Sequence, residues 1–214
     1  MTPTTRALRL AELVALYIAA PLALALLAPP SAMLPALLGA LLVALLLLSR
    51  TPGWSLADLA RGWGRIDWRL VGAFVLIAAL VCGSFVWALV PGQALGLPRW
   101  NTRLWLLILL VYPILSALPQ EVVFRELFFR RYAGLFPGRT SAAVANAVLF
   151  GFAHLMFWNW IAIGFSALGG YVFARGYLDR GGFPMAVALH ALGGAIVFTS
   201  GLGMFFYHGA VPAR

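Results

Sequence analysis

Three polar groups interrupt the apolar C-terminal half of the chain, and their residue types could do chemistry together. The first is Gln120-Glu121-x-x-x-Arg125, in which Glu121 and Arg125 share one helix face and can pair. The second is His154 and the third is His190. A carboxylate and a histidine can activate a water and protonate a leaving amine, and a second histidine can donate to an oxyanion. The set therefore predicts hydrolysis of an amide.

Neighbouring residues would support this site. Asn146, Phe150 and His154 recur every four residues, so they line one stripe of a helix. Asn159 follows shortly after and is expected at the mouth of a cavity, while Pro119 stands at a natural helix start. The carboxylate and the two histidines could instead bind a metal, although the H-E-x-x-H spacing of zinc peptidases is absent. We expect no cofactor, and keep these three as alternative metal ligands.

Each polar group also has a purely structural interpretation. The carboxylate and guanidinium of the first motif could form only a neutralised ion pair, and each histidine could hydrogen-bond a neighbouring helix. The remaining polar residues nearby are expected at the headgroups: a solvated surface of Glu126, Arg130 and Arg131, and an interfacial His208 without a role. Because ionisable groups inside a membrane are costly, their coincidence on three separate segments favours a functional site.

Composition shows what must position these residues. The chain has 214 residues, of which 63% are hydrophobic and 10% charged, with a mean hydropathy of +0.96. Soluble proteins are about 45–50% hydrophobic and 25% charged, so soluble, disordered and collagen-like classes are excluded. The single cysteine, Cys82, excludes an intrachain disulfide. The net charge of +9 comes from arginines at the edges of apolar runs, which is typical of a protein in a lipid bilayer and predicts no nucleic-acid partner.

A membrane-spanning helix needs about 20 apolar residues. Seven runs approach this length: 11–28, 34–48, 70–90, 104–118, 140–157, 159–175 and 184–206. The second and fourth are short, as in tilted or re-entrant segments. The sequence therefore predicts an all-α polytopic membrane bundle of about seven transmembrane helices, six to eight in range, with a polar cavity in its C-terminal half. We divide it into residues 1–103, N-terminal helices and a cytoplasmic loop with a short interfacial helix, and residues 104–207, the core domain.

The arginines predict the orientation of the bundle. With the N-terminus in the cytoplasm, the cytoplasmic segments hold Arg6, Arg9, Arg50, Arg61, Arg65, Arg69, Arg125, Arg130, Arg131, Arg139, Arg175 and Arg180. The opposite side holds only Arg99, Arg103 and Arg214. The positive-inside rule thus favours a cytoplasmic N-terminus, and seven spans would place the C-terminus outside. An all-arginine basic set with many alanines favours a bacterial inner membrane.

At these polar residues the chain resembles the CPBP family, also called ABI. This family comprises the type II CAAX prenyl endopeptidases and bacterial bacteriocin-processing or self-immunity proteins. Its pattern is E-E-x-x-x-R, then F-x-x-x-H, then H-x-x-x-N/D, on successive membrane helices. The matching segments, within about residues 104–203, are Gln120-Glu121-x-x-x-Arg125, Phe150-x-x-x-His154 and His190-x-x-x-Gly194.

The resemblance implies an intramembrane endopeptidase that cuts membrane-anchored or leader-bearing peptide substrates in a cavity between helices. It implies that the first glutamate and first histidine activate water, and that the second histidine and the Asn or Asp stabilise the oxyanion. This chain has Gln120 and Gly194 at two of those positions. Three explanations stay open: Glu121 is the base after a modest helix rotation, His154 alone activates water that Gln120 orients, or the chain keeps the scaffold without activity.

A peptidase is the leading hypothesis, and two other classes compete with it. One is a catalytically inactive CPBP-fold scaffold or bacteriocin-immunity protein that binds a peptide or lipid. The other is a transporter with a Glu/His proton relay, which ranks last because the first half has no carboxylate in the middle of a span. The candidate residues are Glu121, His154 and His190 as catalytic groups, supported by Gln120, Arg125, Asn146 and Asn159.

Overall fold

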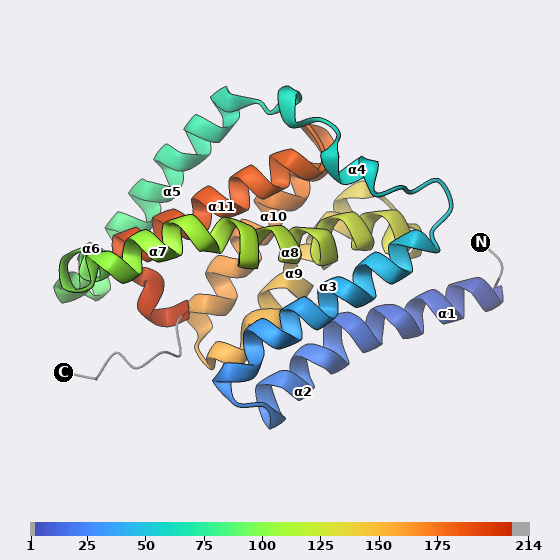
Figure 1. The fold of residues 1–214 in the computed structure, drawn as a ribbon, viewed down its shortest axis with the longest axis horizontal. Coiled ribbons are helices and arrows are strands. Elements are labelled where there is room, and N and C mark those ends of the chain that lie inside the picture. The colour runs from blue at the N-terminus through green and yellow to red at the C-terminus, as the bar shows by residue number, and fades with distance from the viewer. Residues whose placement is uncertain (1–2, 207–214) are drawn as a thin grey trace.

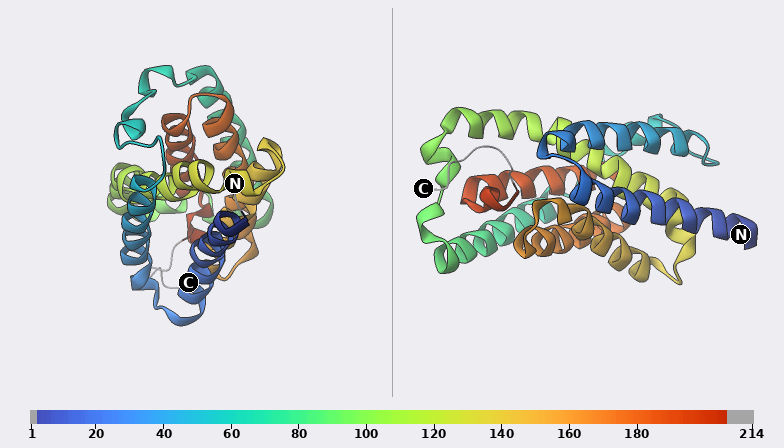
Figure 2. Two further views of the ribbon diagram at one scale, coloured as in Figure 1. Left: turned by 90° about the vertical axis from the view of Figure 1, so that its right-hand side faces the viewer. Right: turned by 90° about the horizontal axis from the view of Figure 1, so that it is seen from below.

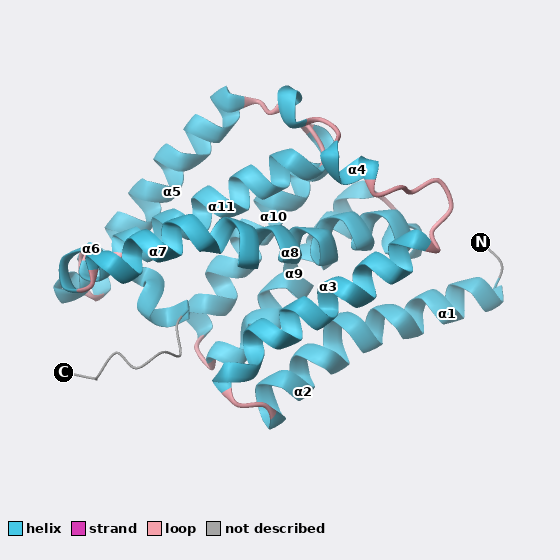
Figure 3. Cartoon of the chain, in the orientation of Figure 1, coloured by secondary structure: helices cyan, strands magenta, loops and turns pink. Residues whose placement is uncertain are grey.

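The computed structural model describes residues 3–206, and this part of the chain is helical with no strand (Figures 1 and 3). Seven helical segments are long and apolar enough to cross a membrane: Thr4–Leu27, Pro30–Ser49, Trp68–Leu89, Thr102–Leu135, Arg139–Phe157, Trp160–Asp179 and Phe183–Ser200. The prediction of an all-α membrane bundle of about seven helices is therefore confirmed. Figure 2 shows an elongated bundle in which these segments run back and forth along the long axis.

The first three spans form the N-terminal half. They are built from α1 (Pro3–Val14), a π-helical turn (Ala15–Ala19), α2 (Ala20–Leu27), a 3₁₀ turn (Pro30–Ala32), α3 (Met33–Ser49) and α5 (Trp68–Leu89). The loop between α3 and α5 contains the expected short helix, α4 (Ala57–Ala60), and a 3₁₀ turn (Trp63–Arg65). In this loop the Ser55 backbone N–H, with Arg61 and Arg130, lowers the pKa of Asp58.

The fourth span differs from its prediction. It follows a 3₁₀ turn (Pro91–Gln93) and α6 (Gly96–Trp100), and it consists of α7 (Thr102–Tyr112), a π-helical turn (Pro113–Ala117), α8 (Leu118–Glu121), a π-helical segment (Val122–Tyr132) and a 3₁₀ turn (Ala133–Leu135). The helix does not begin at Pro119; the span passes through this proline and extends over 34 residues, from Thr102 to Leu135. The π-helical turn explains this. The Leu118 N–H bonds to the Pro113 carbonyl five residues back, so the backbone just before Pro119 does not follow regular α-helical hydrogen bonding, with which a proline would conflict.

Three further spans complete the C-terminal half. They are α9 (Arg139–Ala153) with a 3₁₀ turn (His154–Phe157), α10 (Trp160–Asp179), and α11 (Phe183–Ser200) with a 3₁₀ turn (Leu202–Phe206). Small residues let α9 and α10 pack closely: a Cβ atom at Gly151 would lie 2.8 Å from the Cβ of Ala167, and one at Gly170 would lie 2.9 Å from the Phe150 ring. Such glycine contacts are typical of helix packing in membranes.

The long fourth span crosses the middle of the bundle. In Figure 1, α7 and α8 run between α3 and α11, and α8 packs against both of these helices. The start of α1, the loop around α4 and the turns before α9 and α11 lie at one end of the bundle (right in Figure 1), where most of the arginines lie. This end corresponds to the cytoplasmic side in the predicted orientation, which stays a prediction.

The predicted solvated surface at this end is wrong for two of its three residues. The Glu126 side chain is 2% exposed and accepts hydrogen bonds from Trp54 Nε1 at 3.0 Å, Tyr177 Oη at 2.8 Å and Arg130 Nε at 3.0 Å. The Arg131 side chain is 7% exposed and donates through two nitrogens to Glu12, each at 2.8 Å. The loop around α4 and the neighbouring helices supply these partners, and no sequence periodicity indicates them. Only Arg130 remains substantially exposed.

Replacing Glu126 with alanine is expected to destabilise the fold by about 3 kcal/mol, because it leaves the partly buried Trp54 N–H and Tyr177 hydroxyl without their acceptor. Thermal unfolding of the purified protein in detergent measures this as a midpoint lower by roughly 6–12 °C. The matched control is Asp179→Ala, which breaks more exposed ion pairs with Arg139 and Arg175 and should cost less than about 1 kcal/mol. Equal shifts for the two variants would contradict the assignment.

Candidate active site

Glu121 contacts His190 in the centre of the bundle. The carboxylate is fully buried, and its Oε1 lies 2.7 Å from His190 Nδ1. Packing of α8 against α11 brings together these two residues, which are 69 positions apart in the chain. An ionised carboxylate only accepts hydrogen bonds, so Nδ1 of His190 donates and Nε2 is the nitrogen left for chemistry.

Arg125 holds the other side of the carboxylate. Its side chain is fully buried, and its Nε lies 3.2 Å from Oε2 of Glu121, within ion-pair distance but without hydrogen-bond alignment. The guanidinium carbon lies 4.6 Å from the centroid of the Phe150 ring, and a terminal nitrogen donates to the Gly170 carbonyl at 3.4 Å. A carboxylate, an aromatic face and a backbone carbonyl thus together stabilise this buried positive charge.

Aromatic rings hold the His190 imidazole from several helices. The Phe173 ring of α10 stacks on it with centroids 4.9 Å apart and planes at 15°. Phe150 of α9 and Tyr112 of α7 meet it edge to face, at 5.4 Å and 5.9 Å. The imidazole plane is therefore held by ring packing as well as by the bond to Glu121.

His154 lies beside this pair but bonds to a different partner. It directly follows α9 as the C-cap residue, and its Nδ1 lies 2.8 Å from the Phe150 carbonyl oxygen. Because a carbonyl only accepts, Nδ1 carries a proton, and Nε2 of the neutral ring carries the lone pair. The His154 imidazole is half-buried, unlike that of His190, and both imidazoles contact the Phe150 ring.

The supporting residues have other contacts. Gln120 is partly exposed and donates from Nε2 to Ser116 Oγ of its own helix at 2.9 Å. Asn146 is buried and donates to the Phe124 carbonyl at 2.5 Å, which ties α9 to the fourth span. Asn159 caps α10, accepting from the Ala162 N–H at 2.7 Å, and its amide nitrogen donates to two backbone carbonyls. On the Gln120–Arg125 turn, Glu121 therefore meets a histidine, and Gln120 bonds within its helix.

The alternative metal ligands are not gathered into one set. Within residues 3–206, no group of three or more His, Cys, Asp or Glu side chains is placed to share a metal ion. Glu121 and His190 bond to each other, while His154 bonds to a backbone carbonyl. The contacts are those of a hydrogen-bonded carboxylate–imidazole pair with a second histidine nearby.

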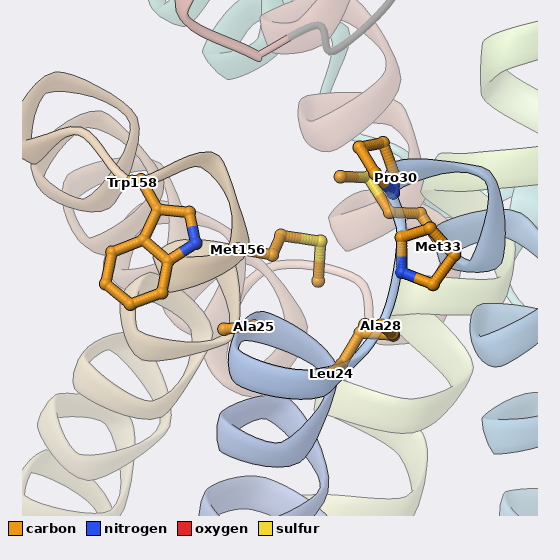
Figure 4. A pocket seen from close by; sticks show the side chains of 8 residues that line it. Leu24, Ala25, Ala28, Pro30, Met33, Met156 and Trp158 are labelled. Atoms are coloured by element: carbon orange, nitrogen blue, oxygen red, sulfur yellow. The ribbon is translucent and has the colours of Figure 1, made fainter.

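Two hollows lie outside this buried pair. One, of about 120 Å³, lies between the end of α2, the start of α3 and the turn that follows His154, with Leu24, Met33, Met156 and Trp158 among its lining residues (Figure 4). The other, of about 500 Å³, is an apolar groove along α5 and α11. Leu109 of α7 lines this groove, and Thr199 and Ser200 of α11 are its polar members.

Sequence reasoning missed two residues of the site, Tyr112 and Phe173, because aromatic residues in apolar runs look like ordinary packing. The one available signal was Gly194, a small residue one helical turn after His190 that leaves room for a neighbouring ring.

One comparison with known proteins gives a match, and the match includes the segments that carry the site. Residues 100–196 match the family model described as Type II CAAX prenyl endopeptidase Rce1-like. A comparison with curated proteins and a comparison with solved structures gave no match. The matched segment contains Glu121, Arg125, His154 and His190. Residues 100–196, a little under half of the chain, are therefore similar to a CAAX protease-like family, in line with the resemblance given by the polar motifs.

Proposed function

We propose that the chain is an intramembrane endopeptidase that hydrolyses peptide bonds of membrane-associated or leader-bearing substrates. The observation that carries the proposal is the 2.7 Å contact between Glu121 and His190, buried within a membrane span, with His154 beside it. The similarity of residues 100–196 to a CAAX protease-like family supports a hydrolase. The high cost of ionisable groups at this depth supports a functional role for them.

His154 is the base that activates water. Its Nε2 carries a lone pair, and its ring is half-buried, whereas Glu121 is fully buried and engaged by two partners. As the water oxygen attacks the peptide carbonyl carbon, Nε2 takes one water proton and the carbonyl oxygen becomes an oxyanion. The C–N bond then breaks, the leaving nitrogen receives the proton, and the products are a carboxylate and an amine.

His190 stabilises the oxyanion from the other side. In the proposed scheme His190 acts as an imidazolium, whose Nδ1–H donates to the Glu121 carboxylate. The Nε2–H of that imidazolium can then donate to the oxyanion. In this scheme Arg125 and the stacked Phe173 ring hold the carboxylate and the imidazole in place.

The apolar groove along α5 and α11 supports a membrane-associated substrate. It has a volume of about 500 Å³, and apolar walls of this kind suit a hydrophobic segment that arrives from the bilayer. The concentration of arginines at one end supports a cytoplasmic N-terminus and, with the composition, a bacterial inner membrane. The proposed mechanism uses no cofactor and no nucleic acid.

A second candidate is a catalytically inactive scaffold or bacteriocin-immunity protein. One observation favours it: residue 120 is an amide that bonds to Ser116 within its own helix, so no second carboxylate is available on that turn. Loss of hydrolysis with retention of the fold would be the expected property of such a chain.

Replacing His154 with alanine is expected to abolish substrate cleavage in cells, because it removes the proposed base. The N-termini of membrane-fraction proteins are compared by mass spectrometry between cells that express the wild type and cells that express the variant. The matched control is His208→Ala, a change of the same type at a residue outside the described part of the chain. New N-termini should appear with the wild type and the control and be absent with His154→Ala. Identical N-termini for all three chains would favour the scaffold.

A further inference from the structure

Gly194 lies on α11 one helical turn after His190, and the Tyr112 ring covers its backbone. A Cβ atom at Gly194 would lie 2.5 Å from Cζ and 2.6 Å from the hydroxyl oxygen of Tyr112. These distances are shorter than non-bonded carbon contacts allow, so any side chain at position 194 would displace the ring. The phenol group therefore occupies the space into which a side chain at position 194 would extend.

The same ring borders the carboxylate–imidazole pair. Its centroid lies 5.9 Å from that of His190 in an edge-to-face contact and 5.6 Å from that of Phe198. Tyr112 ends α7 directly before the π-helical turn Pro113–Ala117. The Phe198 ring and the backbone at Gly194 thus hold a phenol beside the His190 imidazole.

The Tyr112 hydroxyl has no hydrogen-bond partner in the described part of the chain. The residue itself is partly exposed. Three other tyrosines use their hydroxyls inside the fold: Tyr17 donates to the Val123 carbonyl at 2.6 Å, and Tyr132 and Tyr177 donate to carboxylates. The Tyr112 O–H, beside a candidate catalytic histidine, is therefore a hydrogen-bond donor that the fold itself does not use.

We propose that Tyr112 is a further catalytic residue, whose hydroxyl donates a hydrogen bond to the carbonyl oxygen of the scissile peptide. This proposal rests on the proposed peptidase function. It also explains why residue 194 is a glycine, because any side chain there would displace the phenol. The hydrogen bond strengthens as the carbonyl oxygen gains negative charge during water attack, and the proton stays on the tyrosine oxygen. Together, His190 and Tyr112 form a two-donor oxyanion site from α11 and α7.

Tyr112→Phe separates the hydroxyl from the ring, because phenylalanine keeps the packing against Gly194 and His190. The full-length chain is reconstituted in lipid vesicles and given an internally quenched peptide that carries the His154-dependent cleavage sequence found in cells. We expect kcat to fall by about 10²–10³-fold with KM and the thermal midpoint unchanged, since the bond forms chiefly in the transition state.

Two further variants accompany this test. Tyr17→Phe is the matched control, because it removes a buried hydroxyl that bonds to the Val123 carbonyl; it should lower the thermal midpoint and keep kcat. Gly194→Ala approaches the site from the other side, because its methyl group pushes the phenol away; it should lower kcat in the wild type and add little in the Tyr112→Phe background.

The assay distinguishes failure of this assignment from failure of the proposed function. If His154→Ala is inactive while Tyr112→Phe keeps the wild-type kcat, the peptidase stands and the role of Tyr112 is overturned. If the wild type cleaves no faster than His154→Ala, the peptidase proposal falls and the role of Tyr112 falls with it.

Discussion

Replacing Glu121 with glutamine is expected to lower the peptidase rate by about 10²–10⁴-fold. The reason is the 2.7 Å contact with His190, because a neutral amide replaces the charge-assisted hydrogen bond that is proposed to hold the imidazolium at the oxyanion. Glutamine has nearly the same shape, so the fold should persist at lower stability beside Arg125. The rate is measured per folded molecule, with the reconstituted chain and the quenched peptide.

The matched control for this change is Glu126→Gln. It alters a buried carboxylate in the same way and on the same helix, but Glu126 bonds to Trp54, Tyr177 and Arg130. It should affect stability and leave the rate per folded molecule close to that of the wild type. If Glu121→Gln retained the wild-type rate, the carboxylate would be a structural partner of Arg125 with no share in catalysis.

Replacing Arg125 with alanine is expected to have the largest effect on stability, about 3–5 kcal/mol. The change leaves the buried Glu121 carboxylate without its cation and opens space beside the Phe150 ring. The thermal midpoint in detergent should therefore fall by roughly 6–20 °C. Arg125→Lys should recover only part of this loss, because an ammonium group cannot replace the planar guanidinium that contacts Glu121, Phe150 and Gly170 together.

A double variant tests whether uncompensated charge causes that loss. Glu121→Gln with Arg125→Met removes both charges while filling similar volume, and replacement of a buried ion pair by neutral groups is often tolerated. We expect the double variant to be more stable than Arg125→Ala and inactive. If both variants were equally unstable, the packing of Arg125 against the aromatic rings would be the dominant contribution.

The membrane bundle could be predicted from the sequence because continuous apolar stretches of the chain determine its helices. Runs of about 20 apolar residues leave few alternatives to spanning helices. The pairing of Glu121 with Arg125 could also be predicted, since a spacing of four places both on one helix face. The ion-pair distance of 3.2 Å within the fourth span agrees with that expectation.

The rest of the site depends on contacts that no periodicity encodes. The fourth span runs through Pro119 because of a π-helical turn, whereas the proline suggested a helix start. The partner of Glu121 is set by how α8 packs on α11, so the choice between His154 and His190 needed the three-dimensional arrangement. The burial of the Glu126 and Arg131 side chains likewise depends on a loop and helix ends distant in sequence.

The central claim is that this polar site hydrolyses peptide bonds, and isotope incorporation tests it most directly. The purified chain in vesicles is incubated with the substrate peptide in H₂¹⁸O, and the products are analysed by mass spectrometry. The account predicts one ¹⁸O atom in the new C-terminal carboxylate with the wild type and with His208→Ala, and no product above background with His154→Ala or His190→Ala. Labelled product at the wild-type rate from both of these last variants would contradict it.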